Sequence, residues 1–142
     1  MTQTYFDDLT DGQELPTLVN KTTTQQLVFW AAASGDFYQI HYDKDYALGN
    51  NLPGVIVHGA LKHAIIGRYL DEIAGPKGFV QEFKCSFRGM DEPGNDLIIK
   101  ATVTGKRQDA GKNLVDIEVW TENPDGQKTS PGAATIELPS KG

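Results

Sequence analysis

The chain has 142 residues, of which 39% are hydrophobic and 23% charged, and its formal net charge is -6 at pH 7. This length predicts one domain with a hydrophobic core, spanning residues 1–142, and the composition excludes an extended disordered protein. The negative charge argues against a nucleic-acid-binding protein, which usually carries a basic stripe. A local group of Lys and Arg could still hold an anionic ligand.

The cysteine content and the absence of targeting signals bear on the compartment. The single cysteine, Cys85, excludes an internal disulfide and fits a reducing compartment. The first residues lack the basic and apolar regions of a signal peptide, and no apolar run approaches the ~20 residues of a membrane span. We therefore expect a cytoplasmic protein with no membrane partner. No Cys/His spacing typical of a metal site and no phosphate-binding loop is present, so no metal is expected.

The first predicted elements are a short strand over residues 15–22 and a helix directly after it. Thr23, followed three residues later by Gln26, matches a capping box and marks the start of the helix. The apolar run that follows ends at Gly35, a residue type common just beyond helix ends. Asp36 is therefore expected in the loop immediately after the helix.

A second helix of about 18 residues is expected from Val57 to the stop at Gly75 and Pro76. Its predicted apolar face comprises Val57, Ala60, Leu61, Ala64, Ile65, Tyr69 and Ile73. The opposite face is expected to carry Lys62, Arg68, Asp71 and Glu72. Residues 42–54, before this helix, are predicted to be loop-like with one helical turn near residues 44–48.

Alternating apolar and polar residues predict a series of antiparallel strands after this helix. Residues 79–88 should place Phe79, Phe83, Cys85 and Phe87 on one face, and the next strands should bury Leu97, Ile99, Ala101, Val103, Val115, Ile117 and Val119. A tight turn at residues 123–126 leads into a last strand that ends near Leu138. One long helix before such strands predicts an α+β domain whose sheet wraps the helix.

Asp36 and His41 place a carboxylate and an imidazole five residues apart on one short connection. The two groups can converge on a single water, because His titrates near neutrality and Asp can orient it or share its proton. General acid/base groups of this kind contribute roughly 10²- to 10⁴-fold in rate. Each residue also has a non-catalytic interpretation: Asp36 could make only an Asx-turn, and His41 could simply be solvated.

His58 and Gly59 stand where the second helix begins. The unpaired N–H groups of a first helical turn carry partial positive charge, and Gly lets a ligand carbonyl approach the backbone. Such a donor could stabilise an enolate oxygen, a role worth on the order of 10²- to 10³-fold. The alternative is that His58 caps the helix and Gly59 only permits close packing.

Other reactive side chains are expected to have structural roles. His63 lies on the polar face of the helix and is expected to be solvated. Cys85 alternates with phenylalanines and is expected in the core, with no adjacent base to activate it. Asp91 and Glu92 resemble a carboxylate pair, but they stand beside a Pro-Gly turn and are expected to be solvated.

Three segments resemble the hydratase signature of the MaoC-like family, which includes (R)-specific enoyl-CoA hydratases and 3-hydroxyacyl dehydratases. They are Ser34-Gly35-Asp36, His41-Tyr42-Asp43 and Ile56-Val57-His58-Gly59. The family signature reads roughly Ser-Gly-Asp-x-Asn-Pro-x-His-x-Asp, followed further along the chain by two apolar residues and His-Gly. The resemblance covers about residues 5–138.

The resemblance implies a hot-dog fold, an α+β architecture with an antiparallel sheet wrapped around a long central helix. It also implies a homodimer, or a heterodimer with a second hot-dog chain. The implied reaction is hydration of a trans-2-enoyl-CoA or acyl-carrier-protein thioester to the (R)-3-hydroxyacyl thioester, or the reverse dehydration. Asp36 and His41 would activate the water, in individual roles that stay open, and the Gly59 N–H would bind the thioester oxygen. CoA is expected as the carrier of the substrate and not as a bound cofactor.

Further substrate contacts are expected from Tyr38, Gln39, Val57 and His58, with Lys84 and Arg88 as candidates for the phosphates of CoA. Two features depart from the family. Tyr38 and Gln39 stand where it usually has Asn-Pro, and Ala64 stands near a position where some relatives carry Ser.

These departures favour, as an alternative, a non-catalytic acyl-binding subunit that completes the pocket of a partner. A bulkier substrate or weaker catalysis would also account for them. A hot-dog thioesterase fits less well, because no carboxylate is expected on the inner face of the central helix. The presence of both Asp36 and His41 favours the catalytic interpretation. Acyl chain length, and a steroid versus a linear substrate, stay open.

Overall fold

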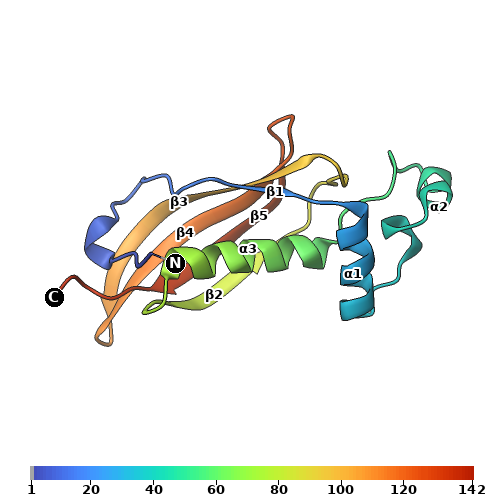
Figure 1. Ribbon diagram of the computed structural model, residues 1–142. Helices are drawn as coiled ribbons and strands as arrows, with labels where there is room; N and C mark the ends of the chain where they lie inside the picture. The colour runs from blue at the N-terminus through green and yellow to red at the C-terminus, as the bar shows by residue number, and fades with distance from the viewer. Residues whose placement is uncertain (1) are drawn as a thin grey trace.

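The structure, a computed structural model, describes residues 2–142 and contains a five-stranded antiparallel sheet that curls around helix α3 (Gly59–Ala74) (Figure 1). The strands are β1 (Leu18–Lys21), β2 (Phe79–Cys85), β3 (Asp96–Asp109), β4 (Lys112–Glu122) and β5 (Lys128–Glu137). Their order in the sheet is β1-β3-β4-β5-β2, with every neighbouring pair antiparallel. This arrangement confirms the α+β hot-dog fold.

The remaining helical elements precede α3 in the chain. They are η1 (Phe6–Asp8), α1 (Thr24–Ser34), η2 (Gln39–His41) and α2 (Lys44–Gly49). Figure 1 shows α1 and α2 beyond the end of the sheet, on the side where α3 begins. In residues 2–142, no helix is both long enough and apolar enough to span a bilayer.

The limits of α1 follow from local capping, as the sequence predicts. The Thr23 hydroxyl accepts a hydrogen bond from the backbone N–H of Gln26 at 3.1 Å, which satisfies one of the free donors of the first turn. Gly35 ends the helix in the left-handed conformation, with φ of 79°, which costs least for a residue without a Cβ. Asp36 therefore leaves the helix end in a fixed direction.

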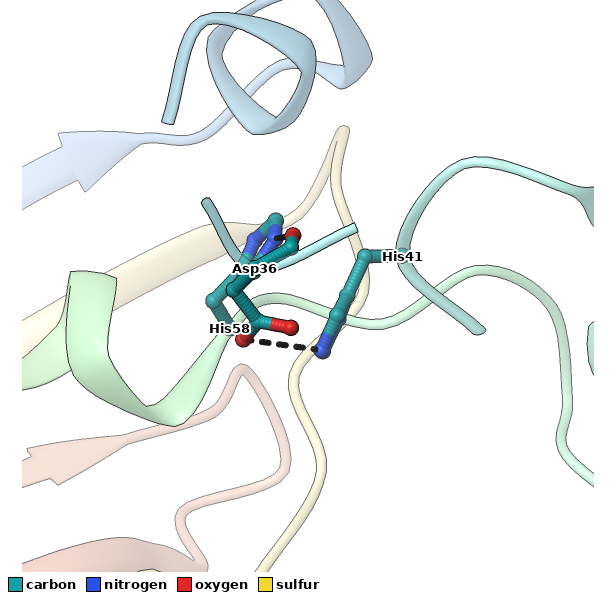
Figure 2. A group of neighbouring side chains, drawn as sticks. All are labelled: Asp36, His41 and His58. Carbon is teal, nitrogen blue, oxygen red and sulfur yellow. Dashed lines mark hydrogen bonds and ion pairs between the residues drawn. The ribbon is translucent and has the colours of Figure 1, made fainter. Parts of the chain in front are cut away.

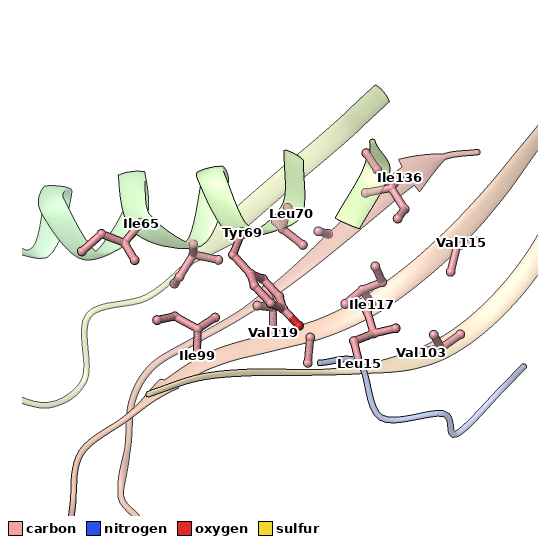
Figure 3. Close-up of a cluster of buried hydrophobic side chains, with 14 of the residues drawn as sticks. Leu15, Ile65, Tyr69, Leu70, Ile99, Val103, Val115, Ile117, Val119 and Ile136 are labelled. Carbon is pink, nitrogen blue, oxygen red and sulfur yellow. The ribbon is translucent and has the colours of Figure 1, made fainter. Parts of the chain in front are cut away.

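The core lies between one face of α3 and the concave face of the sheet (Figure 3). The helix contributes Leu61, Ile65, Ile66, Tyr69, Leu70 and Ala74, and the sheet contributes Leu97, Ile99, Ala101, Val103, Val115, Ile117, Val119, Ala134 and Ile136. The alternation predicted for β3 and β4 is therefore confirmed. Burial of such side chains stabilises the fold by roughly 1.5–3 kcal/mol for each large one.

The predicted orientation of α3 is wrong at three positions. Ala60 and Ala64, expected in the core, are exposed, whereas Lys62, expected in solvent, is 2% exposed. The buried face is centred closer to Ile66 and Leu70, both of which share the four-residue spacing of Lys62. A lysine is therefore buried beneath the helix.

The predicted facing of residues 79–88 is only partly correct. Phe83 and Cys85 pack against the core as expected, but Phe79 and Phe87 are exposed. A break in the β2–β5 register between residues 80 and 82 shifts the alternation, so Val80 and not Phe79 packs inward. Phe87 lies beyond the end of β2, where strand alternation no longer applies.

Candidate active site

His41 is held in a buried and specific orientation. Its side chain belongs to η2, the residue is 7% exposed, and its Nδ1 lies 2.7 Å from the backbone oxygen of Ile56. Because a carbonyl only accepts, Nδ1 must carry the hydrogen, and Nε2 of the neutral ring keeps a free lone pair. The interpretation of His41 as a solvated loop histidine is therefore wrong.

Asp36 uses one carboxylate oxygen to shape its own loop. Its Oδ1 accepts a hydrogen bond from the N–H of Tyr38 at 3.3 Å, and its own N–H donates to the Ser34 hydroxyl at 3.2 Å. The Asx-turn, which is the non-catalytic interpretation of Asp36, is therefore present. It leaves Oδ2 turned toward His41, as Figure 2 shows.

The two functional groups face each other without a direct hydrogen bond. Oδ2 of Asp36 and Nε2 of His41 are 3.9 Å apart, which is too long for a direct bond but short enough for one water to contact both. With His41 neutral, both atoms are acceptors. A single water can donate one hydrogen to each and keep its oxygen lone pairs free for attack.

His58 contacts both Asp36 and His41 through its buried ring. It is fully buried, and its ring stacks on that of His41 with centroids 3.7 Å apart and an interplanar angle of 19°. Its Nε2 lies 3.2 Å from the backbone oxygen of Asp36, so Nε2 carries the hydrogen, and Nδ1 is buried without a partner. Burial, and then repulsion from the ring of His41 when that ring is protonated, lower the pKa of His58, which favours its neutral form.

Gly59 is the first residue of α3, and no capping side chain covers the helix start. His58 occupies the N-cap position, as the alternative interpretation had it, but its side chain makes no capping hydrogen bond. A Cβ on Gly59 would lie 2.7 Å from the Phe87 ring, which agrees with the close-packing interpretation. The first-turn N–H groups, which attract negative charge, stay uncapped by this residue.

A cavity of about 330 Å³ opens beside this helix start, and we call it the His41 hollow. It is lined by His41, Ile56, Val57, Gly59, Lys62, Phe87, Arg88, Gly89 and Met90. Its volume lies within the range of small-molecule pockets. The His41 hollow therefore joins the imidazole, the start of α3 and one basic side chain that the sequence singled out, Arg88.

The other predicted contact residues lie in different places. Val57 lines the His41 hollow, but Lys84 lines a separate depression on the sheet with Glu82 and Asp116. Tyr38 is exposed and stands edge-on to His41, with ring centroids 6.3 Å apart. Gln39 is also exposed, as the first residue of η2. The structure does not bring Lys84 to the site.

Three further side chains are placed by local interactions. The Asp43 carboxylate accepts a hydrogen bond from the Tyr46 N–H at 3.0 Å and so caps α2, which gives this part of the signature a structural role. His63 is exposed, as predicted, and stacks on Phe83. Cys85 packs against the core, and burial raises the pKa of its thiol, which keeps it protonated and unreactive.

Asp91 corrects the sequence interpretation. It was expected in solvent, but it is 6% exposed and pairs with Lys62 at 2.8 Å. The neighbouring residues carry no local signal for this burial. The helical spacing of Lys62 with Ile66 and Leu70 was the available sign that a lysine faces inward.

Asp36, His41 and His58 are also the cluster of possible metal ligands found in residues 2–142, with one ligand atom from each within 4.8 Å of the others. One nitrogen of each imidazole is already hydrogen-bonded to a backbone carbonyl. An ion here would compete with water for Asp36 and for Nε2 of His41.

The sequence profile described as "MaoC like domain" matches residues 10–123. The chain belongs to the MaoC-like domain family. The matched region includes Asp36, His41 and Gly59, together with α3 and most of the sheet. The site geometry and the family assignment therefore concern the same part of the chain.

Proteins similar to this MaoC-like chain include a fatty acid synthase subunit and an R-hydratase. It is 30% identical over 112 residues to fatty acid synthase subunit beta of Saccharomyces cerevisiae, a match that covers 78% of this chain but 5% of that protein. R-hydratase PhaJ1 from Pseudomonas aeruginosa has a TM-score of 0.85 at 26% identity, covering 96% of this chain and 86% of the other. The ChsH1–ChsH2 complex of Mycobacterium tuberculosis contains a chain with the same fold, at a TM-score of 0.79 and 20% identity, covering 91% and 98%.

Proposed function

We propose that this chain hydrates trans-2-enoyl thioesters to (R)-3-hydroxyacyl thioesters, or catalyses the reverse dehydration. The acyl group would be carried by CoA or by an acyl-carrier protein, and CoA would act as a carrier and not as a resident cofactor. Family membership and the likeness to an R-hydratase support this reaction class. The active unit would be a homodimer or a pair with a second hot-dog chain.

The observation that carries the proposal is the 3.9 Å separation of Asp36 Oδ2 and His41 Nε2. It leaves room for one water next to a cavity that also contains the start of α3. A thioester carbonyl directed at the Gly59 N–H would place its β-carbon near this water in an extended enoyl group. In this proposal Asp36 and His41 hold the water, and the Gly59 N–H binds the thioester carbonyl.

The proposed hydration balances without any other reactant. The water oxygen bonds to the β-carbon, and a proton from that water passes to His41 Nε2 or Asp36 Oδ2. The double-bond electrons move toward the thioester carbonyl, where the Gly59 N–H stabilises the developing oxyanion. The α-carbon then receives the proton, and dehydration follows the same steps in reverse.

Loss of the conjugated thioester absorbance, followed with the purified protein and a panel of enoyl-CoAs, tests the activity. Asp36→Asn and His41→Ala should each lower kcat by roughly 10²- to 10⁴-fold, the usual contribution of a general acid or base. His63→Ala is the matched control, because His63 is exposed and lies outside the His41 hollow. Activity that survives both substitutions at Asp36 and His41 would remove this assignment.

A second candidate function is a non-catalytic acyl-binding subunit. The departure from Asn-Pro at Tyr38 and Gln39 favours it, because the exposed Tyr38 ring stands beside His41. A relative solved as a two-protein complex shares the fold. Co-purification with a second hot-dog chain, together with no turnover by this chain alone, would support the subunit and exclude independent catalysis.

A further inference from the structure

A buried ion pair lies at the edge of the proposed active site. Lys62 and Asp91 are 2% and 6% exposed, and Lys62 Nζ donates to Asp91 Oδ2 at 2.8 Å and to the backbone oxygen of Gly89 at 2.9 Å. A buried charge without partners is strongly unfavourable. The two acceptors explain how this ammonium is tolerated next to the core.

The pair attaches one chain segment to the start of α3. We call residues 86–91 the wall segment; it follows β2, and Asp91 is its last residue. The backbone oxygen of Asp91 accepts a hydrogen bond from the Val57 N–H at 2.8 Å, just before α3. Asp91 is therefore tied to the helix start by its backbone and to Lys62, within the helix, by its side chain.

The other side of the wall segment is tied to the sheet. The N–H groups of Arg88 and Gly89 both donate to the backbone oxygen of Thr129 on β5, at 2.9 Å each. A Cβ on Gly89 would lie 2.9 Å from the Thr129 side chain, so this contact leaves little freedom. The hydrogen bonds of the Lys62 ammonium, to Asp91 and to the backbone oxygen of Gly89, connect the segment to the buried face of α3.

The wall segment forms one side of the His41 hollow. Four of its residues line the cavity, namely Phe87, Arg88, Gly89 and Met90. The rest of the lining comes from His41, from residues 56 and 57, and from Gly59 and Lys62 of α3. The ring of Phe87 packs so close to Gly59 that a Cβ there would lie 2.7 Å from it. The width of the hollow thus depends on how closely the wall segment is held to α3.

We propose that Lys62 is a positioning residue that, through Asp91, sets the width of the His41 hollow and so selects the size of the acyl group. The inference rests on the proposed function where it concerns substrate choice. Stability alone does not require a charged pair here, since buried ion pairs can often be replaced by apolar residues of similar volume without loss of stability. A role in cavity geometry accounts for a pair with one member on the helix and the other on the wall segment.

The test compares two variants of the pair with a control variant of a second ion pair. Lys62→Met leaves the Asp91 carboxylate buried and unpaired, and should lower the melting temperature most. The double variant Lys62→Met/Asp91→Leu removes both charges and should recover much of that loss. The control is Lys100→Met/Glu122→Leu, because this pair also spans 2.8 Å but lies between β3 and β4, outside the hollow.

Two measurements separate positioning from simple stabilisation. The first is the ratio of kcat/KM for a long and a short enoyl-CoA, which should change by about 10-fold in the charge-free double variant, the discrimination that one methylene can command in a fitted pocket. The second is amide hydrogen exchange, which should become faster at Val57, Arg88 and Gly89. The control pair should alter neither measurement.

A double variant with restored melting temperature, an unchanged substrate ratio and unchanged exchange would overturn the proposal. If the wild-type protein turns over no enoyl-CoA, the proposed function fails, but exchange at the three amides still decides whether the pair holds the wall segment. If the double variant does not fold, Lys62→Arg is the alternative. It keeps the charge but has a wider head group, so a substrate ratio equal to that of the wild type would also overturn the proposal.

Discussion

The imidazole of His58 stacks on that of His41, with ring centroids 3.7 Å apart. His58 has no exposed surface, and its Nε2–H donates to the backbone oxygen of Asp36. One buried ring therefore contacts both members of the proposed acid/base pair. Burial against a second histidine disfavours the charged form of this ring. We therefore expect protonation of His58 to disrupt the stack.

Protonation of His58 should make stability depend on pH. Its pKa in the folded protein is lowered by burial and by His41. In the unfolded chain it returns to about 6.5. The unfolded state therefore binds more protons, and the free energy of unfolding should fall as the pH drops from about 6.5 through the lowered folded pKa.

Urea unfolding between about pH 8 and pH 5 measures this slope. His58→Phe keeps a ring for stacking but cannot titrate, so the decline should be shallower than in the wild type. His63→Phe is the control, because His63 is exposed and should leave the slope unchanged. Equal slopes in the wild type and in His58→Phe would show that His58 is not the responsible group.

Gly59→Ala should impair activity much more than stability. The new Cβ would meet the Phe87 ring at 2.7 Å, and because Phe87 is 55% exposed, we expect the ring to move toward solvent. We expect a change in unfolding free energy within about 1 kcal/mol. The displaced ring should disturb the cavity and lower kcat/KM by up to about 10²-fold, as small misplacements near a reacting centre can.

The double variant Gly59→Ala/Phe87→Ala completes a thermodynamic cycle. Removal of the ring should restore part of the lost kcat/KM, which shows as a coupling between the two positions. If the effects of the two substitutions on kcat/KM are additive, Gly59 does not act through the Phe87 ring. Phe79→Ala is a matched control, since this exposed phenylalanine lies outside the His41 hollow.

Gln39→Pro should stabilise the protein. Gln39 stands where the family usually has proline, and the local backbone suits that residue. Tyr38 has φ of -64° and ψ of 126°, the extended conformation that a residue before proline prefers. Gln39 begins η2, where its N–H has no acceptor within the helix. We expect a gain of about 0.4–1 kcal/mol, because the substitution restricts the unfolded chain.

Denaturant unfolding of this variant needs a control in which proline removes a real hydrogen bond. Gln26→Pro provides one, because the Gln26 N–H donates to the Thr23 hydroxyl. It should destabilise the protein by about 1 kcal/mol, the usual loss for an N-cap. A destabilising Gln39→Pro would show that the loop has departed from the backbone geometry of the family.

Arg88→Ala should weaken the binding of CoA esters specifically. Arg88 lines the His41 hollow, and a charge-assisted hydrogen bond to phosphate is worth about 1.5–3 kcal/mol. KM for an enoyl-CoA should therefore rise by about 10-fold, while KM for the matching pantetheine thioester, which lacks the nucleotide phosphates, should not change. Lys84→Ala, in a separate depression, should leave both values near those of the wild type.

Local signals in the sequence were sufficient for the elements around the candidate site. The Thr23 cap, the Gly35 terminator and the alternation of β3 and β4 act through near neighbours, so they could be read from the chain alone. They place Asp36 just beyond a helix and His41 on the same connection. The Asx-turn at Asp36 is equally local.

Tertiary structure alone decided what surrounds these residues. Lys62 and Asp91 are 29 positions apart, so no local pattern in the sequence pairs one with the other. The stacking of His58 on His41, and the contact of Phe87 with Gly59, likewise join separate segments. Capping and alternation reflect hydrogen bonds and burial within one element, whereas ion pairs, stacked rings and cavities depend on how elements pack together, and that packing is set by the core as a whole.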